Sequence, residues 1–248
     1  MLAEIHYTQT TPSDDINETA TGRLSFFVSS LPMAGTITAI DVQPRNPRRV
    51  NVFLDGAYAF ALSVEVATQN NLKRGMILSD QGVAALLAQD SWQKTYDAAL
   101  NYLSYRPRSE DEMRRYLSRR QTTPEVTDQI VARLKESKLI DDEAFARFWV
   151  ENRESFSPRS RRALRSELRS KGVADSTIAD SLSGDDDEAA YRAAQKKARS
   201  LAGGDYQTFR RRLIPFLQRR GFAYETARAA VNRLWAEIKA NEDAAETT

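Results

Sequence analysis

The sequence predicts a mainly α-helical protein, in which a tandem array of three three-helix repeats follows a small antiparallel β-hairpin or sheet module. Two observations lead to this fold class. The pair Asp55-Gly56 lies between two stretches of alternating apolar and β-branched residues, which is the strongest short-range signal for a β-hairpin. Beyond Ser91 the apolar residues follow a helical spacing instead, and this helical part resembles itself with a period of about 50 residues.

The β signals fall between residues 34 and 90. An alternating stretch at 36–40 and a second one at 49–54 are separated by a proline-rich turn. Asp55-Gly56 then turns the chain into a third strand, and a short helix is expected near Val64–Asn71. A sheet of about three strands is marginal on its own, so we expect it to pack against neighbouring helices.

Helix-start signals divide the rest of the chain. Ser109 and Glu112 form a capping-box pattern, and Thr123-Pro124 places an N-cap residue before a proline at the first helical position. Two acidic runs, at 141–143 and 185–188, directly precede apolar-periodic helices and are expected to cap them. Since neither run has the ligand spacing of a calcium loop, we expect no metal site.

One short phrase occurs twice: residues 105–109 read YRPRS and residues 156–160 read FSPRS. Three copies of the surrounding segment align on Leu117, Leu168 and Leu217. The pairs that follow each leucine at matching positions are Arg120-Gln121, Lys171-Gly172 and Arg220-Gly221. Such self-similarity marks a helical array whose units, each a helix triplet, cannot bury their apolar faces alone. The phrase therefore duplicates a helix start, and we expect its arginines to face outward.

These signals define the predicted domains. They are a disordered leader at 1–33, which is polar and has no sustained period, the β-rich module at 34–90, helical repeats at 91–140, 141–184 and 185–240, and an acidic tail at 241–248.

A stripe of arginines is the strongest binding signal. Arg162, Arg165 and Arg169 recur at helical spacing opposite Leu164 and Leu168, so they face solvent or a partner. Because this stripe has almost no acidic neighbours, we interpret it as a surface for a polyanion or an acidic protein.

The other cations allow two interpretations. A solvated helix face or a favourable contact with the helix dipole accounts well for Arg120, Lys171 and Arg220, which precede the end of a helix. For the arginines of 210–212 and 219–220, which flank an apolar face, binding and solvation are equally well supported. The complete set of candidate binding residues is Arg108, Arg115, Arg119, Arg159, Arg162, Arg165, Arg169, Lys171, Arg210, Arg211, Arg212, Arg219 and Arg220.

Composition excludes several function classes. The chain has no cysteine, which excludes disulfides and thiolate chemistry, and its one histidine, His6, lies in the predicted leader. No apolar run is long enough to span a bilayer and no signal peptide is recognisable, so a cytoplasmic protein without membrane contact is expected. We predict no catalytic residue and no cofactor, and hence no enzyme.

The helical segments resemble the RecX family, bacterial regulators of the RecA recombinase. The stretches that carry the resemblance are 103–117, 139–150 with Arg153, 168–173 and 217–222, and the hairpin at 54–60 is similar to an N-terminal extension of some members. Gln121 departs from the family, in which a glycine is usual at this turn.

The resemblance implies a curved, monomeric protein of three three-helix repeats that binds the RecA–DNA filament along its groove. There it would lower ATP hydrolysis and strand exchange, or destabilise the filament, with single- and double-stranded DNA as further partners. Two other classes remain open. A helix-turn-helix-like DNA binder would read duplex sequence, and a structure-specific nuclease would need a magnesium-binding carboxylate cluster that the sequence does not show beyond its helix caps.

Overall fold

The computed structural model describes residues 34–246, so the predicted leader lies outside the described residues. Contacts divide the chain into two compact units between Asp90 and Ser91, and each unit is described by itself. No helix within the described residues is long and apolar enough to cross a membrane.

The first unit, as described from residue 34, holds a four-stranded antiparallel sheet in the order β3-β2-β1-β4. Its elements are β1 (Gly35–Gln43), β2 (Asn46–Leu54), β3 (Ala57–Ser63), α1 (Val64–Gln69) and β4 (Ile77–Leu78), followed by the start of α2 (Asp80–Ser104). The hairpin at Asp55-Gly56 is confirmed: both residues have positive φ, 48° and 87°, as a type I′ turn requires. The fourth strand was not predicted because two residues carry no alternation.

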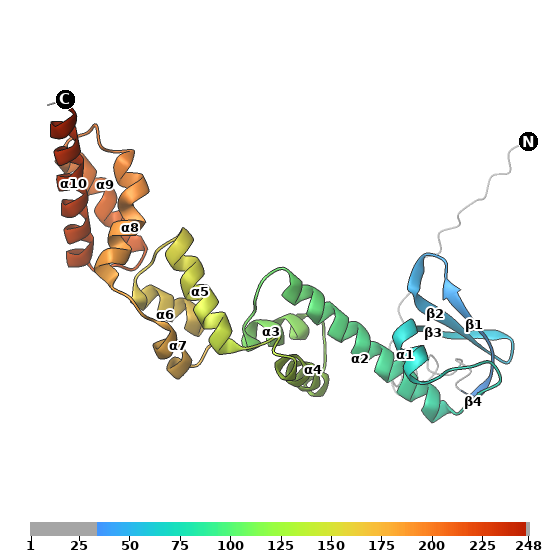
Figure 1. The fold of residues 1–248 in the computed structure, drawn as a ribbon. Helices are drawn as coiled ribbons and strands as arrows, with labels where there is room; N and C mark the ends of the chain where they lie inside the picture. The colour runs from blue at the N-terminus through green and yellow to red at the C-terminus, as the bar shows by residue number, and fades with distance from the viewer. Residues whose placement is uncertain (1–33, 247–248) are drawn as a thin grey trace, which may run out of the picture. The chain divides into compact units, whose positions relative to one another are not determined.

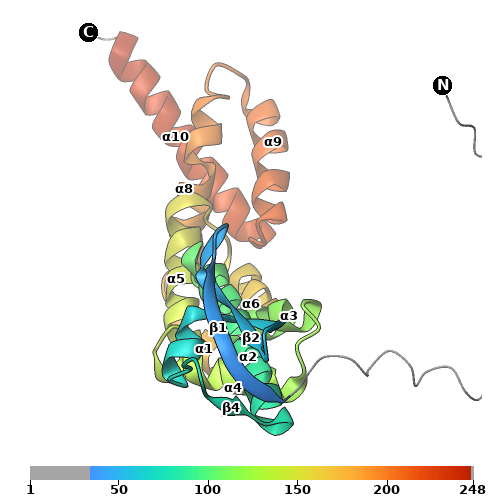
Figure 2. The same ribbon diagram turned by 90° about the vertical axis from the view of Figure 1, so that its right-hand side faces the viewer.

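One face of this sheet is buried. Ile37, Val52 and Leu54 pack with Val66 of α1 and Val83 of α2 in a single apolar cluster. The register of β1 with β2, and of β2 with β3, shifts where a bulge interrupts the ladder, and such bulges bend strands. Figure 2 shows the resulting curvature of β1.

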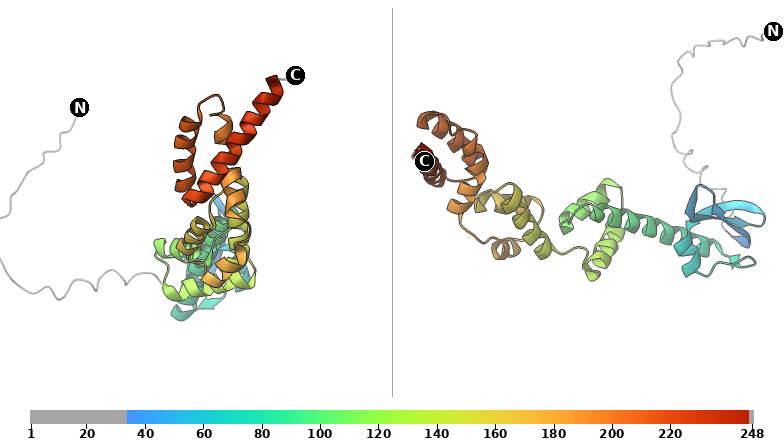
Figure 3. Two further views of the ribbon diagram at one scale, coloured as in Figure 1. Left: turned by 90° about the vertical axis from the view of Figure 1, so that its left-hand side faces the viewer. Right: turned by 45° about the horizontal axis from the view of Figure 1, so that its top comes forward.

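The second unit consists of helices and connecting turns throughout its described residues (Figure 1). After α2 come α3 (Glu110–Arg119), α4 (Pro124–Glu136), α5 (Asp142–Phe156), α6 (Arg161–Ser170), α7 (Asp175–Ser181), α8 (Asp186–Arg199), α9 (Tyr206–Arg219) and α10 (Tyr224–Glu246). They form three triplets, α2-α3-α4, α5-α6-α7 and α8-α9-α10, and Figure 3 shows α10 lying along α8 and α9. The predicted array of three-helix repeats is confirmed.

Each triplet buries its own apolar cluster, contrary to the expectation that a unit cannot bury its face alone. The aligned residues Leu117, Leu168 and Leu217 are each fully buried, and each belongs to a different cluster. Because the three clusters are separate among the described residues, the contacts that join the repeats must be of another kind.

The predicted helix starts are confirmed. The side chains of Ser109, Thr123 and Ser160 each accept a hydrogen bond from a backbone N–H in the first turn of the helix that follows. Asp141 and Asp185, from the two acidic runs, do the same for α5 and α8. These carboxylates therefore act as helix caps.

The middle helices of the three repeats end in the same way. After Leu117, Leu168 and Leu217 the chain makes the paired hydrogen bonds of a Schellman motif. The residue that this motif holds in the left-handed region is Gln121 (φ 60°), Gly172 (φ 77°) or Gly221 (φ 91°). The first turn thus keeps the shared geometry although a glutamine replaces the glycine.

Helix α9 differs from its two counterparts by one additional turn at its start. The position that corresponds to Ser109 and Ser160 is Phe209, which is fully buried inside the helix rather than at its cap. The helix continues through Pro215, which has no N–H to donate to the carbonyl of Arg211.

Candidate functional site

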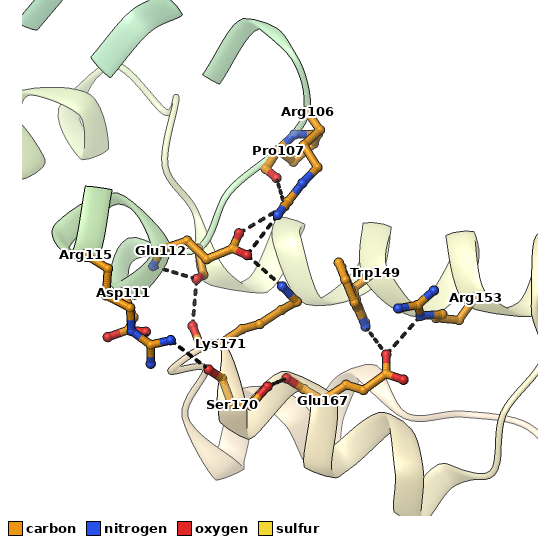
Figure 4. Close-up of polar contacts among 11 residues, drawn as sticks. Arg106, Pro107, Asp111, Glu112, Arg115, Trp149, Arg153, Glu167, Ser170 and Lys171 are labelled. Atoms are coloured by element: carbon orange, nitrogen blue, oxygen red, sulfur yellow. Dashed lines mark hydrogen bonds and ion pairs between the residues drawn. The ribbon is translucent and has the colours of Figure 1, made fainter. Parts of the chain in front are cut away.

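The duplicated phrase forms the joint between repeats, as Figure 4 shows for the first of the two joints. The Ser109 hydroxyl donates to the backbone carbonyl of Lys171 at 2.6 Å and also accepts from the N–H of Glu112. Gly172 packs so closely that a Cβ there would lie 2.7 Å from Cγ of Asp111. We call this contact of the start of α3 with the end of α6 the first junction.

The second junction repeats this arrangement between α6 and α9. The N–H of Ser160 donates to the carbonyl of Arg220 at 3.1 Å. A Cβ on Gly221 would lie 2.6 Å from Oγ of Ser160 and 2.7 Å from Cβ of Ala163. The Arg220 guanidinium also donates to Oγ of Ser157 and to the carbonyl of Pro158. The duplicated segment therefore begins the middle helix of its own repeat and also contacts the turn that ends the middle helix of the next repeat.

A half-buried ionic cluster strengthens the first junction. Glu112 accepts from Arg106 at 2.9 Å and from Lys171 at 2.6 Å, so its carboxylate does not close the capping box with Ser109 (Figure 4). The Lys171 ammonium also lies 4.1 Å from the ring centre of Trp149. Burial alone would raise the pKa of Glu112, but the hydrogen bonds from Arg106 and Lys171 outweigh it and lower the pKa to about 2.

This depressed pKa predicts acid sensitivity of the junction. Since the folded-state pKa of Glu112 lies below the unfolded value of 4.5, its contribution is fully present above that value and is lost as the pH falls towards 2. The shift corresponds to about 3 kcal/mol. Urea unfolding between about pH 6 and pH 3 should show Glu112→Gln with a flatter loss of stability than wild type. Glu125→Gln, at an exposed position on α4, serves as the control, and parallel curves for Glu112→Gln and wild type would contradict the assignment.

The structure corrects the expected positions of four candidate residues. Arg108 and Arg159, expected to face outward, are half-buried, and Lys171 and Arg220 belong to the junctions. Arg108 stacks over the ring of Tyr102 at 4.0 Å. Arg159 forms an ion pair of 3.0 Å with Glu167. Lys171 and Arg220 therefore join neighbouring repeats, whereas Arg108 and Arg159 make contacts within their own repeat.

The arginine stripe is also less uniform than predicted. Arg169 forms an ion pair of 2.6 Å with Asp175, which corrects the expectation that the stripe lacks acidic partners. Arg162 and Arg165 are exposed and form no ion pair within residues 34–246. Two cations of the stripe are therefore available to a partner.

The remaining candidates divide in the same way. Arg115 pairs with Asp111 at 2.6 Å, and Arg210 donates to the hydroxyl of Tyr224 at 2.8 Å. The candidates that are exposed and form no ion pair in the described part of the chain are Arg119, Arg211, Arg212 and Arg219.

A further group of cations escaped the sequence analysis. A groove of about 650 Å³ lies between residues 154–158, at the end of α5 and the start of the second junction, and helix α8. We call it the basic groove; its lining includes Phe156, Arg192, Lys196, Lys197, Phe216 and Arg220. Arg192, Lys196 and Arg199 follow one another at helical spacing on α8, so a search of this helix for basic stripes could have found them. The sequence analysis considered only the acidic residues at the start of this helix, as its N-terminal cap.

The sheet-forming segment and the three helix triplets each match a family model of known proteins. Residues 35–79 match the family model described as the regulatory protein RecX N-terminal domain, and residues 96–134, 141–182 and 185–231 match the first, second and third three-helix domains of RecX. The chain is 33% identical over 211 residues to the regulatory protein RecX of Bacillus subtilis, covering 84% of this chain and 79% of that protein. It is 30% identical to the RecX of Lactobacillus johnsonii, covering 84% and 77%. A crystal structure of a regulatory protein RecX aligns with a TM-score of 0.59 at 28% identity, covering 82% of this chain and 98% of the other.

Proposed function

Because the chain belongs to the RecX family, we propose that it binds the RecA–DNA filament and restrains the recombinase, lowering ATP hydrolysis, strand exchange and filament growth or persistence. It acts as a monomer in the cytoplasm and performs no chemistry of its own. Single- and double-stranded DNA are further partners. By this action it modulates recombination, DNA repair and the SOS response.

The observation that carries the proposal is the pair Arg162 and Arg165 on α6. Junctions hold this helix at both ends: its start receives the turn at Gly221, and its own final turn, at Gly172, packs on α3. The two arginines therefore project from a fixed backbone, so less backbone freedom is lost when a partner binds them. Exposed cations that form no ion pair suit DNA phosphates and acidic protein surfaces.

We expect the double variant Arg162→Gln, Arg165→Gln to remain folded and to bind the RecA–DNA filament more weakly. The salt dependence of its binding should fall by roughly one unit for each phosphate that the variant no longer binds. Titration of RecA ATP hydrolysis at several salt concentrations measures both quantities. Arg133→Gln with Arg228→Gln is the matched control, since these exposed arginines pair with acids on their own helices. Unchanged affinity and salt slope would exclude the pair from binding. Equal binding to filament and naked DNA would favour a DNA-binding protein without a recombinase partner.

A further inference from the structure

The basic groove carries more positive charge than its surroundings balance. Arg192, Lys196, Lys197 and Arg220 line it against the single lining carboxylate of Glu154, and no ion pair joins these residues within the described chain. Lys197 and Arg220 lie over the ring of Phe216, at 4.7 and 4.5 Å from its centre. Burial lowers the pKa of Arg220, and the neighbouring charge of Arg159 lowers it further, as expected where cations crowd together. The groove is thus complementary to a polyanion.

An exposed aromatic ring stands at the edge of this groove. Phe156, the last residue of α5, is 82% exposed. Tyr105 occupies the matching place in the first repeat and is 77% exposed, beside a groove whose charged lining of Arg106, Arg108, Lys138 and Asp141 is mixed. The basic groove has four cations against one carboxylate, one cation more than the groove beside Tyr105, in which Arg106 is also paired with Glu112.

We propose that the basic groove binds single-stranded nucleic acid, with a base stacked on Phe156 and the backbone phosphates on Arg192 and Lys196. A single strand presents the two chemistries that the groove offers to a ligand, because its phosphates are regularly spaced and its bases have free faces. A duplex presents the phosphates without free base faces. An acidic peptide presents charge without obligatory flat rings. This inference deepens the proposed function, on which it rests for its setting, by naming the filament component that the groove takes.

The test compares two probes that share their phosphates. Binding of the full-length protein to fluorescein-labelled oligothymidylate, and to an abasic oligonucleotide of the same length, is measured by fluorescence anisotropy without RecA. Phe156→Ala should weaken binding of oligothymidylate by about 5- to 150-fold, the range for losing one stacked base, and leave the abasic probe unaffected. Because the Phe156 ring is mostly exposed, its removal leaves the buried clusters intact.

Two further variants separate stacking from charge. Arg192→Gln with Lys196→Gln should weaken binding of both probes and reduce the salt slope by about 0.7 for each phosphate that is released from the groove. Tyr105→Ala, at the matching repeat position, should change neither. The proposal is overturned if Phe156→Ala binds oligothymidylate normally, if it loses both probes equally, or if a duplex competes as well as a single strand.

A parallel titration of RecA ATP hydrolysis distinguishes failure of this inference from failure of the proposed function. Wild-type protein that inhibits RecA while Phe156→Ala retains oligothymidylate binding would overturn the groove assignment alone. Wild-type protein that binds oligothymidylate through Phe156 without affecting RecA would overturn the regulatory proposal alone.

Discussion

Gly172→Ala is expected to destabilise the helical unit by about 2–5 kcal/mol, because it combines a steric and a backbone penalty. The backbone of Gly172 lies in the left-handed region, where a side chain costs roughly 1–2 kcal/mol. The added methyl would also press on Cβ and Cγ of Asp111, which belong to the rigid start of a side chain rather than its flexible end. Relief requires the first junction to open. Urea unfolding followed by circular dichroism measures the loss.

The chain supplies the matched control for this substitution. Gln121 occupies the corresponding position of the first repeat with φ of 60°, and its side chain is exposed. Gln121→Ala keeps the same backbone cost and meets no neighbouring repeat, so it should change stability little. If Gly172→Ala proves as mild as Gln121→Ala, the close contact with Asp111 does not restrain the junction.

Lys171→Met should cost about 1.5–3 kcal/mol, since the half-buried carboxylate of Glu112 loses its nearest cation and keeps only Arg106. Both side chains are less than one-fifth exposed, at 16% and 14%, so solvent screens the pair weakly. The tryptophan emission should change in parallel, because the ammonium lies against Trp149. Urea unfolding followed by fluorescence measures both effects.

Arg169→Met is the control for the loss of a cation two residues away. The ion pair of Arg169 with Asp175 is exposed, so its removal should have only a small effect. On a Glu112→Gln background the cost of Lys171→Met should shrink, because no carboxylate remains there to be stabilised by the ammonium. A cost that is the same on both backgrounds would show that Lys171 acts through packing alone.

Local patterns determine most of the fold. The apolar spacing around Leu117, Leu168 and Leu217, the capping residues and the turn at Asp55-Gly56 are decided by nearby residues, and each was predicted correctly. The two-residue strand β4 was missed because its pairing with β1 is decided by tertiary contact rather than by a pattern of its own.

The cations were harder to assign because their partners are remote in sequence. Lys171 pairs with Glu112, which lies 59 residues earlier, and no helical spacing reveals such a contact. Arg169 meets Asp175 across the turn at Gly172, beyond the reach of a search along one helix. Predicting which arginines stay available therefore required the folded arrangement of the repeats.

The additional turn of α9 gives the array a direction and an end. To join a repeat on each side, a middle helix needs a capping serine at its start, which contacts the glycine turn of the next repeat, and a glycine turn at its end, which contacts the start of the previous repeat. Among the described helices only α6 has both. Among the described repeats, the first has an exposed Gln121 where the other two have a packed glycine turn, and the third has the buried Phe209 at the position of the capping serine. A tandem duplication of the middle repeat would thus contain both the serine start and the glycine turn that a junction needs. A duplicate of the last repeat would lack a serine start on which another glycine turn could pack. Additional repeats joined by the same contacts would therefore have to arise by duplication of the middle repeat.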